Sequence, residues 1–267
     1  MAKAKVPAAY YVREWYEKSE IDYFSAFVKA YIPFNAWMND HFKGEATDRA
    51  MLERVKSDAN TFRQKILTLL ELEDTAGYEF RGAIGSLHGA LEESTVANSG
   101  EKISFQNVVI CKNSITNVNQ SYHGLQYSAK YDQSTGATTV EVKENKSGKI
   151  LVALSEPGYP TEDTVIKNPS VNALNQSRLD YLLGVYRQVN PRKEESLLYQ
   201  GRKKKEGIVC GAYKMIKEEK KLAAGLIEIL YSLRNALFHG VIDPNKDANK
   251  VYGAAYRIMH TLVGALT

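Results

Sequence analysis

Leu233-Arg234-Asn235-Ala236-Leu237-Phe238-His239-Gly240 is the stretch that decides the fold of this chain. It ends a segment whose apolar residues recur at helical spacing, at Leu222, Leu226, Ile229, Leu230, Leu233 and Leu237. Gly240 suits the left-handed position that closes a helix, and Pro244 follows soon after. The sequence therefore predicts one long amphipathic helix, from about Ala212 to Phe238, with Arg234 and His239 at its end.

Arg234 and His239 bring two chemical groups to that helix end. Arginine is a permanent cation with a donor fork suited to phosphate, and histidine exchanges a proton near neutral pH. Five positions turn a straight helix by about 500°, which leaves the two side chains about 140° apart. The helix must therefore end near His239, or a second subunit must supply the partner groups. The alternative is structural, because arginine and histidine near a helix end often bond its terminal carbonyls.

The octapeptide resembles the Arg-x4–6-His motif of the HEPN superfamily, including its apolar positions and its terminal glycine. The aromatic stretch at 21–37 also resembles the first helix of some HEPN proteins. The resemblance implies a helical bundle that forms a homodimer, with both copies of the motif in one cleft. It implies an endoribonuclease of toxin or antiphage-defence type that needs no metal or cofactor, with RNA as substrate and an antitoxin or defence-system protein as partner.

The same resemblance assigns roles to three residues. His239 takes the proton of the ribose 2′-hydroxyl or protonates the leaving 5′-oxygen. Arg234 stabilises charge on the phosphate, and Asn235 orients the phosphate or the histidine. Many HEPN domains have no nuclease activity, so the alternative is a dimerising, RNA- or ligand-binding regulatory subunit. Val241 stands where toxins silenced by nucleotide transfer carry a tyrosine, so we do not expect that mode of control.

Two other patterns compete with this motif. Arg81 and His88 have the same spacing, but their glycine-rich surroundings favour core or surface roles. Glu141 and Lys143 lie on one face of a predicted strand, with Asp132 before them, an arrangement faintly similar to a magnesium nuclease motif. We favour a polar strand face there, and we predict no metal site.

The basic run Arg202, Lys203, Lys204 and Lys205 lies in the connector before the long helix. Such a run can hold an RNA backbone through phosphate contacts, and the alternative is a solvated loop. The net charge of +4 permits an RNA partner without demanding one. Charge alone therefore does not choose between these roles.

The chain reads as helical, then strand-rich, then helical. Helices are expected from about 24 to 38 with a kink at Pro33, from 48 to 72, and from 80 to 91. Strands are expected at 103–110, 125–131, 138–142 and 150–154, with turns at 132–136 and 144–148 and a polar loop at 156–169. Further helices are expected at 174–189 and after Asp247.

We interpret this order as a mainly α fold, a HEPN-like helical bundle interrupted by a small antiparallel β insertion. Residues 1–97 and 171–267 supply the bundle, and residues 98–170 form the insertion. The two helical blocks are joined in this interpretation because neither has enough helices to form a stable bundle alone. The composition, with 44% hydrophobic and 25% charged residues, is that of an ordinary globular protein. Cys111 and Cys210 lie far apart, and no signal peptide or membrane-spanning run is evident, so we expect a cytoplasmic protein without a membrane partner.

Overall fold

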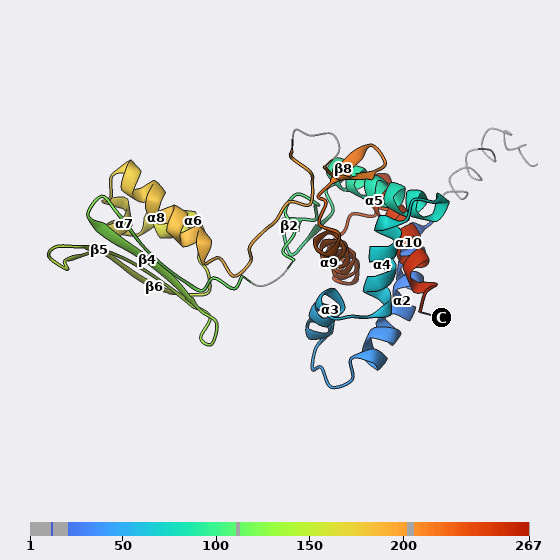
Figure 1. Cartoon of the computed structure of the whole chain (residues 1–267), viewed down its shortest axis with the longest axis horizontal. Coiled ribbons are helices and arrows are strands. Elements are labelled where there is room, and N and C mark those ends of the chain that lie inside the picture. The colour runs from blue at the N-terminus through green and yellow to red at the C-terminus, as the bar shows by residue number, and fades with distance from the viewer. Residues whose placement is uncertain (1–11, 13–20, 111–112, 202–205, 267) are drawn as a thin grey trace, which may run out of the picture. The chain divides into compact units, whose positions relative to one another are not determined.

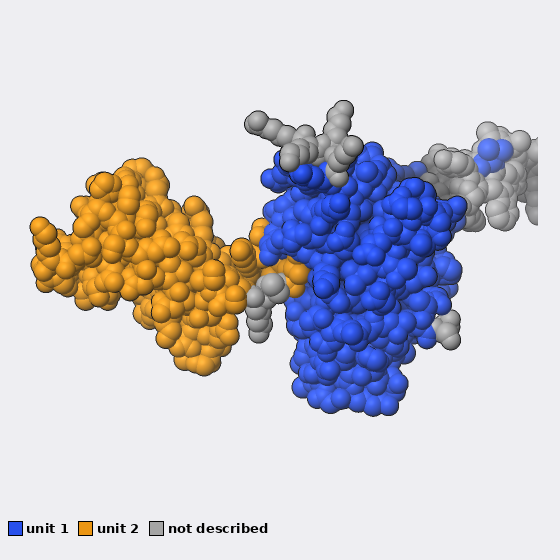
Figure 2. All heavy atoms as spheres, in the orientation of Figure 1, with its two compact units in different colours: residues 1–108, 195–267 blue, residues 109–194 orange. Residues whose placement is uncertain are grey.

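The computed structural model describes residue 12 and residues 21–110, 113–201 and 206–266. Its residues fall into two compact units, one from 1–108 and 195–267 and the other from 109–194 (Figure 2). The second unit therefore interrupts the first in sequence. Among the described residues, no helix combines the length and the apolar character that crossing a membrane requires.

The first unit is mainly helical (Figure 1). Its helices are α2 (Tyr23–His41), α3 (Asp48–Ser57), α4 (Thr61–Glu71), α5 (Thr75–Glu93), α9 (Glu219–Phe238) and α10 (Lys246–Val263). Two short antiparallel hairpins accompany them, β1 (Ala97–Asn98) with β2 (Glu101–Lys102), and β7 (Ile208–Cys210) with β8 (Tyr213–Met215).

The core of this unit forms around α9, in which every residue from Leu222 to Leu230 is buried. Aromatic side chains join the other helices to one another. Tyr252 of α10 packs against Phe27 of α2, with ring centroids 5.3 Å apart, and its hydroxyl donates to the carbonyl of Leu233 at 2.7 Å. Phe34 of α2 and Phe62 of α4 lie 4.4 Å apart. The hydrogen bond from Tyr252 thus holds α10 against the last turns of α9, where the motif lies, and the ring contacts join α2 to α10 and to α4.

The second unit is a four-stranded antiparallel sheet in the order β3 (Asn117–Tyr122), β4 (Leu125–Asp132), β5 (Ala137–Glu144) and β6 (Ile150–Pro157). The short helices α6 (Glu162–Lys167) and α7 (Pro169–Asn172) and the longer α8 (Gln176–Gln188) lie on one face of the sheet (Figure 1). Apolar side chains from both layers form a core, for example Tyr127 and Val142 with Leu182 and Tyr186. The unit thus has a core of its own.

Several helix and strand predictions need correction. The helix expected at 48–72 is two helices, because Asp58 ends α3 and the side chain of Asn60 caps α4 by accepting from the backbone N–H of Arg63 at 2.8 Å. The long helix begins at Glu219 rather than near Ala212, because Gly211 adopts a left-handed conformation (φ +59°) and turns the chain into the hairpin β7–β8. The helix expected at 80–91 is longer and runs over Thr75–Glu93.

The strand predictions are correct in part. The three strands expected between 125 and 154 are present, and Gly136 and Gly148 have positive φ in the turns expected there. The stretch 103–110 is not a strand, because only Val108 forms a bridge, to Glu195. Strand β3 was not expected, and the loop expected at 156–169 contains α6.

The boundaries of the insertion also differ from those expected. The second unit spans 109–194 rather than 98–170. The reason is α8, which we assigned to the bundle. Its buried residues Leu182, Val185 and Tyr186 instead belong to the core that includes the sheet. An amphipathic helix shows the same periodicity whichever apolar surface it covers.

Candidate functional site

The end of α9 separates the two motif residues by local backbone geometry. Arg234 lies within the last turns of the helix, and His239 is its C-cap, with a backbone N–H that donates to the carbonyl of Asn235 at 2.9 Å. Gly240 follows with φ +65°, which confirms the left-handed residue expected there. Its N–H donates to Leu237 and the N–H of Val241 to Ala236, so the terminal carbonyls of α9 are satisfied by the turn itself.

The guanidinium of Arg234 is held by three neighbours. One terminal nitrogen, Nη1, donates to Oδ1 of Asn235 at 2.9 Å, and the other, Nη2, lies 3.4 Å from Oδ2 of Asp48 at the start of α3. The guanidinium also lies over the ring of Phe238, 4.9 Å from its centroid. The side chain remains 24% exposed. Asn235 therefore orients Arg234 in the structure.

A pocket of about 410 Å³ lies beside Arg234 between α2 and the end of α9. It is lined by Val28, Tyr31, Ile32, Asn35, Ala36, Arg234 and Phe238. The hydroxyl of Tyr31 is buried without a hydrogen-bond partner, and burial raises the pKa of this phenol although the charge of Arg234 opposes the shift. The pocket is thus lined mostly by apolar side chains, with Arg234 as its one cationic residue among those described.

His239 does not line this pocket. Its side chain is exposed, and it makes no hydrogen bond, ion pair or ring contact with any residue that the structure describes. Within one chain, the structure therefore brings Arg234 together with Asn235, Asp48 and Phe238, and it shows no contact between Arg234 and His239.

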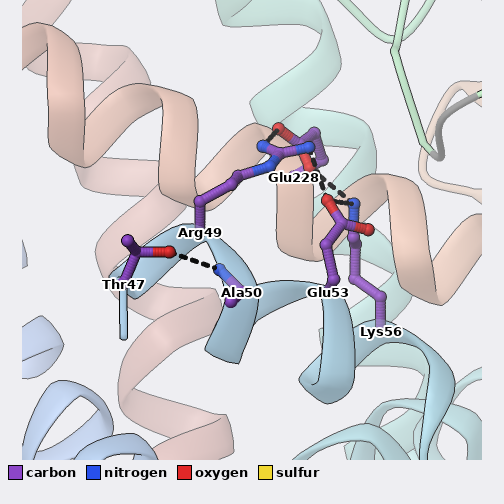
Figure 3. A network of polar contacts seen from close by, with 6 residues as sticks. All are labelled: Thr47, Arg49, Ala50, Glu53, Lys56 and Glu228. Atoms are coloured by element: carbon purple, nitrogen blue, oxygen red, sulfur yellow. Dashed lines mark hydrogen bonds and ion pairs between the residues drawn. The ribbon is translucent and has the colours of Figure 1, made fainter. Parts of the chain in front are cut away.

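Helix α3 is attached to α9 by a network of charged side chains (Figure 3). Glu228 of α9 accepts from Nζ of Lys56 at 2.8 Å and from Nη1 of Arg49 at 2.5 Å. Lys56 also contacts Glu53 at 3.0 Å. Lys56 and Glu228 are only 5% and 8% exposed. This network fixes α3, and with it Asp48, relative to the motif helix.

The competing pair Arg81 and His88 has structural roles in the bundle. Arg81 is buried and donates to the carbonyls of Leu70 and Leu72 at 3.0 and 2.7 Å, so it caps the C-terminal end of α4. His88 is buried against the rings of Phe105 and Tyr213. Of the core or surface roles that the sequence favours for this pair, the structure shows core roles.

Glu141, Lys143 and Asp132 do not assemble a nuclease site. Glu141 and Lys143 are half-exposed and 4.0 Å apart on β5. Asp132 pairs with Ala137 and Glu141 with Ser128, four residues further back on β4, which places Asp132 about 13 Å along the strand from Glu141. Hydrogen bonds from the side chain and backbone of Ser134 lower the pKa of Asp132 to about 2. No group of His, Cys, Asp and Glu side chains among the described residues has the arrangement of a metal site.

Two other predictions have a limited outcome. Arg202, Lys203, Lys204 and Lys205 lie outside the described residues, so their proposed contacts with RNA stay a prediction. Asp48 and the pocket beside Arg234 were not predicted. Asp48 lies 186 residues before Arg234, and in the sequence it reads only as the start of a helix.

A search of protein-family models, curated proteins and solved structures gives no match to this chain.

Proposed function

We propose that this protein is a metal-independent endoribonuclease of toxin or antiphage-defence type, in which Arg234, Asn235 and His239 act on RNA in a composite site of a homodimer. The observation that carries the proposal is the placement of Arg234. Its guanidinium is partly exposed beside a pocket and is oriented by Asn235. Such a guanidinium, with donors still free, can bind a phosphodiester oxygen through charge-assisted hydrogen bonds.

The proposed reaction uses the ribose 2′-hydroxyl as nucleophile. A neutral His239 takes its proton, the 2′-oxygen forms a bond to phosphorus, and Arg234 stabilises the charge on the pentacoordinate phosphate. The bond from phosphorus to the 5′-oxygen then breaks, and a protonated histidine supplies the proton to that oxygen. The products are a 2′,3′-cyclic phosphate and a 5′-hydroxyl. DNA lacks the 2′-hydroxyl and is not a substrate.

Two features support a second subunit. The side chain of His239 has no partner among the described residues of its own chain. Large apolar side chains are exposed on both sides of it, with Phe238 60% and Val241 59% exposed, and Ile32 on α2 is 59% exposed. Apolar surface of this kind around a polar site is typical of an interface. A second copy would cover it and bring another His239 to Arg234.

Purified protein tests the proposal with structured RNA in EDTA. We expect the parent protein to cut RNA with cyclic-phosphate ends, and Arg234→Ala and His239→Ala to lose that activity. His260→Ala is the matched control, because His260 is an exposed histidine at the end of α10. If the parent leaves RNA intact under all activating conditions while remaining folded and dimeric, the ribonuclease proposal is wrong.

Mixed dimers test the composite site. Arg234→Ala and His239→Ala proteins are unfolded together, refolded and assayed. If Arg234 of one subunit works with His239 of the other, each mixed dimer contains one complete pair and regains activity. If both residues act within one chain, no mixed dimer has a complete pair and the mixture stays inactive. Light scattering measures the mass of the assembly in the same samples.

A binding module is the second candidate function. The observation that favours it is the absence, among the described residues, of a group that orients the ring of His239, whereas a general base is normally held by a partner. In that case the protein is a dimerising, RNA- or ligand-binding regulatory subunit. An inert parent protein that nevertheless binds RNA, and loses that binding in Arg234→Ala, would support this function.

A further inference from the structure

Asp48 contacts the arginine of the motif from a different helix. The two terminal nitrogens of Arg234 have separate acceptors, Oδ1 of Asn235 at 2.9 Å and Oδ2 of Asp48 at 3.4 Å. Asn235 is the next residue on α9, whereas Asp48 is the first residue of α3. The orientation of Arg234 thus depends on the position of a second helix.

The helix that carries Asp48 is anchored at its start and along its length. The hydroxyl of Thr47 accepts from the backbone N–H of Ala50 at 3.1 Å and fixes the first turn of α3 (Figure 3). Further along α3, Lys56 and Arg49 bind the carboxylate of Glu228 on α9. Met51, Leu52 and Val55 are buried. A carboxylate on such an anchored helix defines a point in space better than one on a loop does.

The two contacts leave part of the guanidinium free. A guanidinium has five N–H donors, and Asn235 and Asp48 each engage one terminal nitrogen. The remaining donors include Nε and one hydrogen on each terminal nitrogen, which is enough for a bidentate contact with phosphate. Phe238 lies against one face of the group. The orientation of the guanidinium plane is therefore fixed, while some of its N–H donors remain available to a phosphate.

We propose that Asp48 is a positioning residue, which holds Arg234 in the orientation that binds the scissile phosphate in the transition state. The inference rests on the proposed function, and it adds a residue that acts through Arg234 without touching the RNA.

The main alternative is that Asp48 opposes RNA binding through its negative charge. The two roles predict effects on different kinetic constants. If Asp48 acts by charge, its removal strengthens RNA binding and lowers KM. If Asp48 acts by positioning, its removal lowers kcat and leaves KM nearly unchanged, because the contact to phosphate in the transition state loses its geometry. A split between kcat and KM therefore separates them.

The variants are Asp48→Ala, Asp48→Asn and the control Asp58→Ala. Asp58 lies at the other end of α3, pairs with Arg54 at 2.9 Å and has a side chain 39% exposed, against 41% for Asp48. We expect Asp48→Ala to lower kcat by about tenfold to a hundredfold at unchanged KM. Asp48→Asn keeps an acceptor at the same place and should recover kcat to within about threefold. Asp58→Ala should match the parent.

A second measurement does not depend on cleavage. In ¹⁵N NMR spectra, the guanidinium signals of Arg234, assigned from their absence in Arg234→Ala, should show slow rotation about the Cζ–Nη bonds in the parent and in Asp58→Ala. Asp48→Ala should show fast rotation. The thermal unfolding of each variant is measured alongside, so that loss of the fold is recognised.

The outcomes are distinct. A parent protein that cuts no RNA contradicts the proposed function, and the NMR signals then decide alone whether Asp48 holds Arg234. If the parent cuts RNA, the positioning role is overturned when Asp48→Ala keeps its kcat or lowers KM, or when Asp58→Ala has the same effect. It is also overturned when the rotation of Arg234 is the same with and without Asp48.

Discussion

The ammonium group of Lys56 donates to the carboxylate of Glu228 at 2.8 Å, and this buried pair joins α3 to the helix that carries the motif. A buried ion pair is weak evidence for stability, because desolvation offsets its attraction. Removing one partner is different, since it leaves the other charge buried. Lys56 would then lose the carboxylate of Glu228 at 2.8 Å, while its contact with the half-exposed Glu53 at 3.0 Å remains.

Glu228→Gln should therefore destabilise the protein, by about 3 kcal/mol in the free energy of unfolding. Urea unfolding followed by circular dichroism measures the change. Glu45→Gln is the control, because Glu45 pairs with the half-exposed Arg54 at 3.4 Å, and an exposed pair of this kind contributes about 1 kcal/mol or less. The double variant Lys56→Met with Glu228→Leu should regain most of the stability. A loss below that of the control would contradict the role we give to this pair.

Gly240 should tolerate alanine poorly for reasons of backbone conformation alone. Its φ is +65°, and nothing lies within 4 Å of an added Cβ, so a substitution meets strain but no clash. We expect Gly240→Ala to cost about 1 kcal/mol and to disturb His239 next to it. Gly82→Ala is the matched control, and we expect it to change stability in the opposite direction. Gly82 lies inside α5, and nothing lies within 4 Å of an added Cβ there. Alanine should therefore stabilise that helix by about 0.5–1 kcal/mol. Equal effects of the two substitutions on the melting temperature would refute this explanation.

Local patterns predicted the parts of the fold that local chemistry determines. The turn at Gly136, the end of α9 at Gly240 and the strands β4–β6 follow from glycines and alternating apolar residues nearby in the sequence. The partner of α8 did not follow, because Leu182 and Val185 would suit a bundle or a sheet equally. Strand β3 was missed because its residues, apart from Val118 and Tyr122, are polar.

The candidate site divides in the same way. Arg234, Asn235 and His239 are neighbours in sequence, and their hydrogen bond and helix cap follow from that spacing. Tertiary packing alone brings Asp48 into contact with Arg234 and places Tyr31 in the same pocket. A single aspartate after a threonine carries no sign of a distant arginine. A single sequence therefore does not predict which distant charged residues contact the arginine of a helical motif.

The stability of the first unit should fall in acid partly through His88. This side chain is 3% exposed and lies between Phe105 and Tyr213, and burial lowers its pKa below 6.5, although the charge of Glu92 opposes the shift. The unfolded chain then binds a proton more readily than the folded chain does. The contribution of a neutral His88 is fully present above pH 6.5 and is lost as the pH falls through that value toward the lower folded pKa.

His88→Phe should make stability less dependent on pH over this range. Free energies of unfolding are measured at pH 7.5 and 5.0 for the parent and the variant. The decrease should be larger in the parent, since all other groups titrate alike in both proteins. An equal decrease would show that His88 is not protonated more easily in the unfolded chain.

The insertion should be removable without unfolding the first unit. Val108 and Glu195 exchange both backbone hydrogen bonds, at 3.0 and 2.9 Å, so the ends of the segment 109–194 emerge from one antiparallel pair. Such a pair can be closed by a two-residue Asn-Gly turn. We expect the shortened protein to unfold in one cooperative transition and to give a helical circular dichroism spectrum. We expect residues 109–194 alone to fold around the core of Tyr127 and Tyr186.

The ribonuclease assay on the shortened protein then tests the role of the insertion, since retained cleavage with altered substrate choice would assign the insertion to substrate recognition. Aggregation of the shortened protein would instead mean that the first unit needs the insertion to fold.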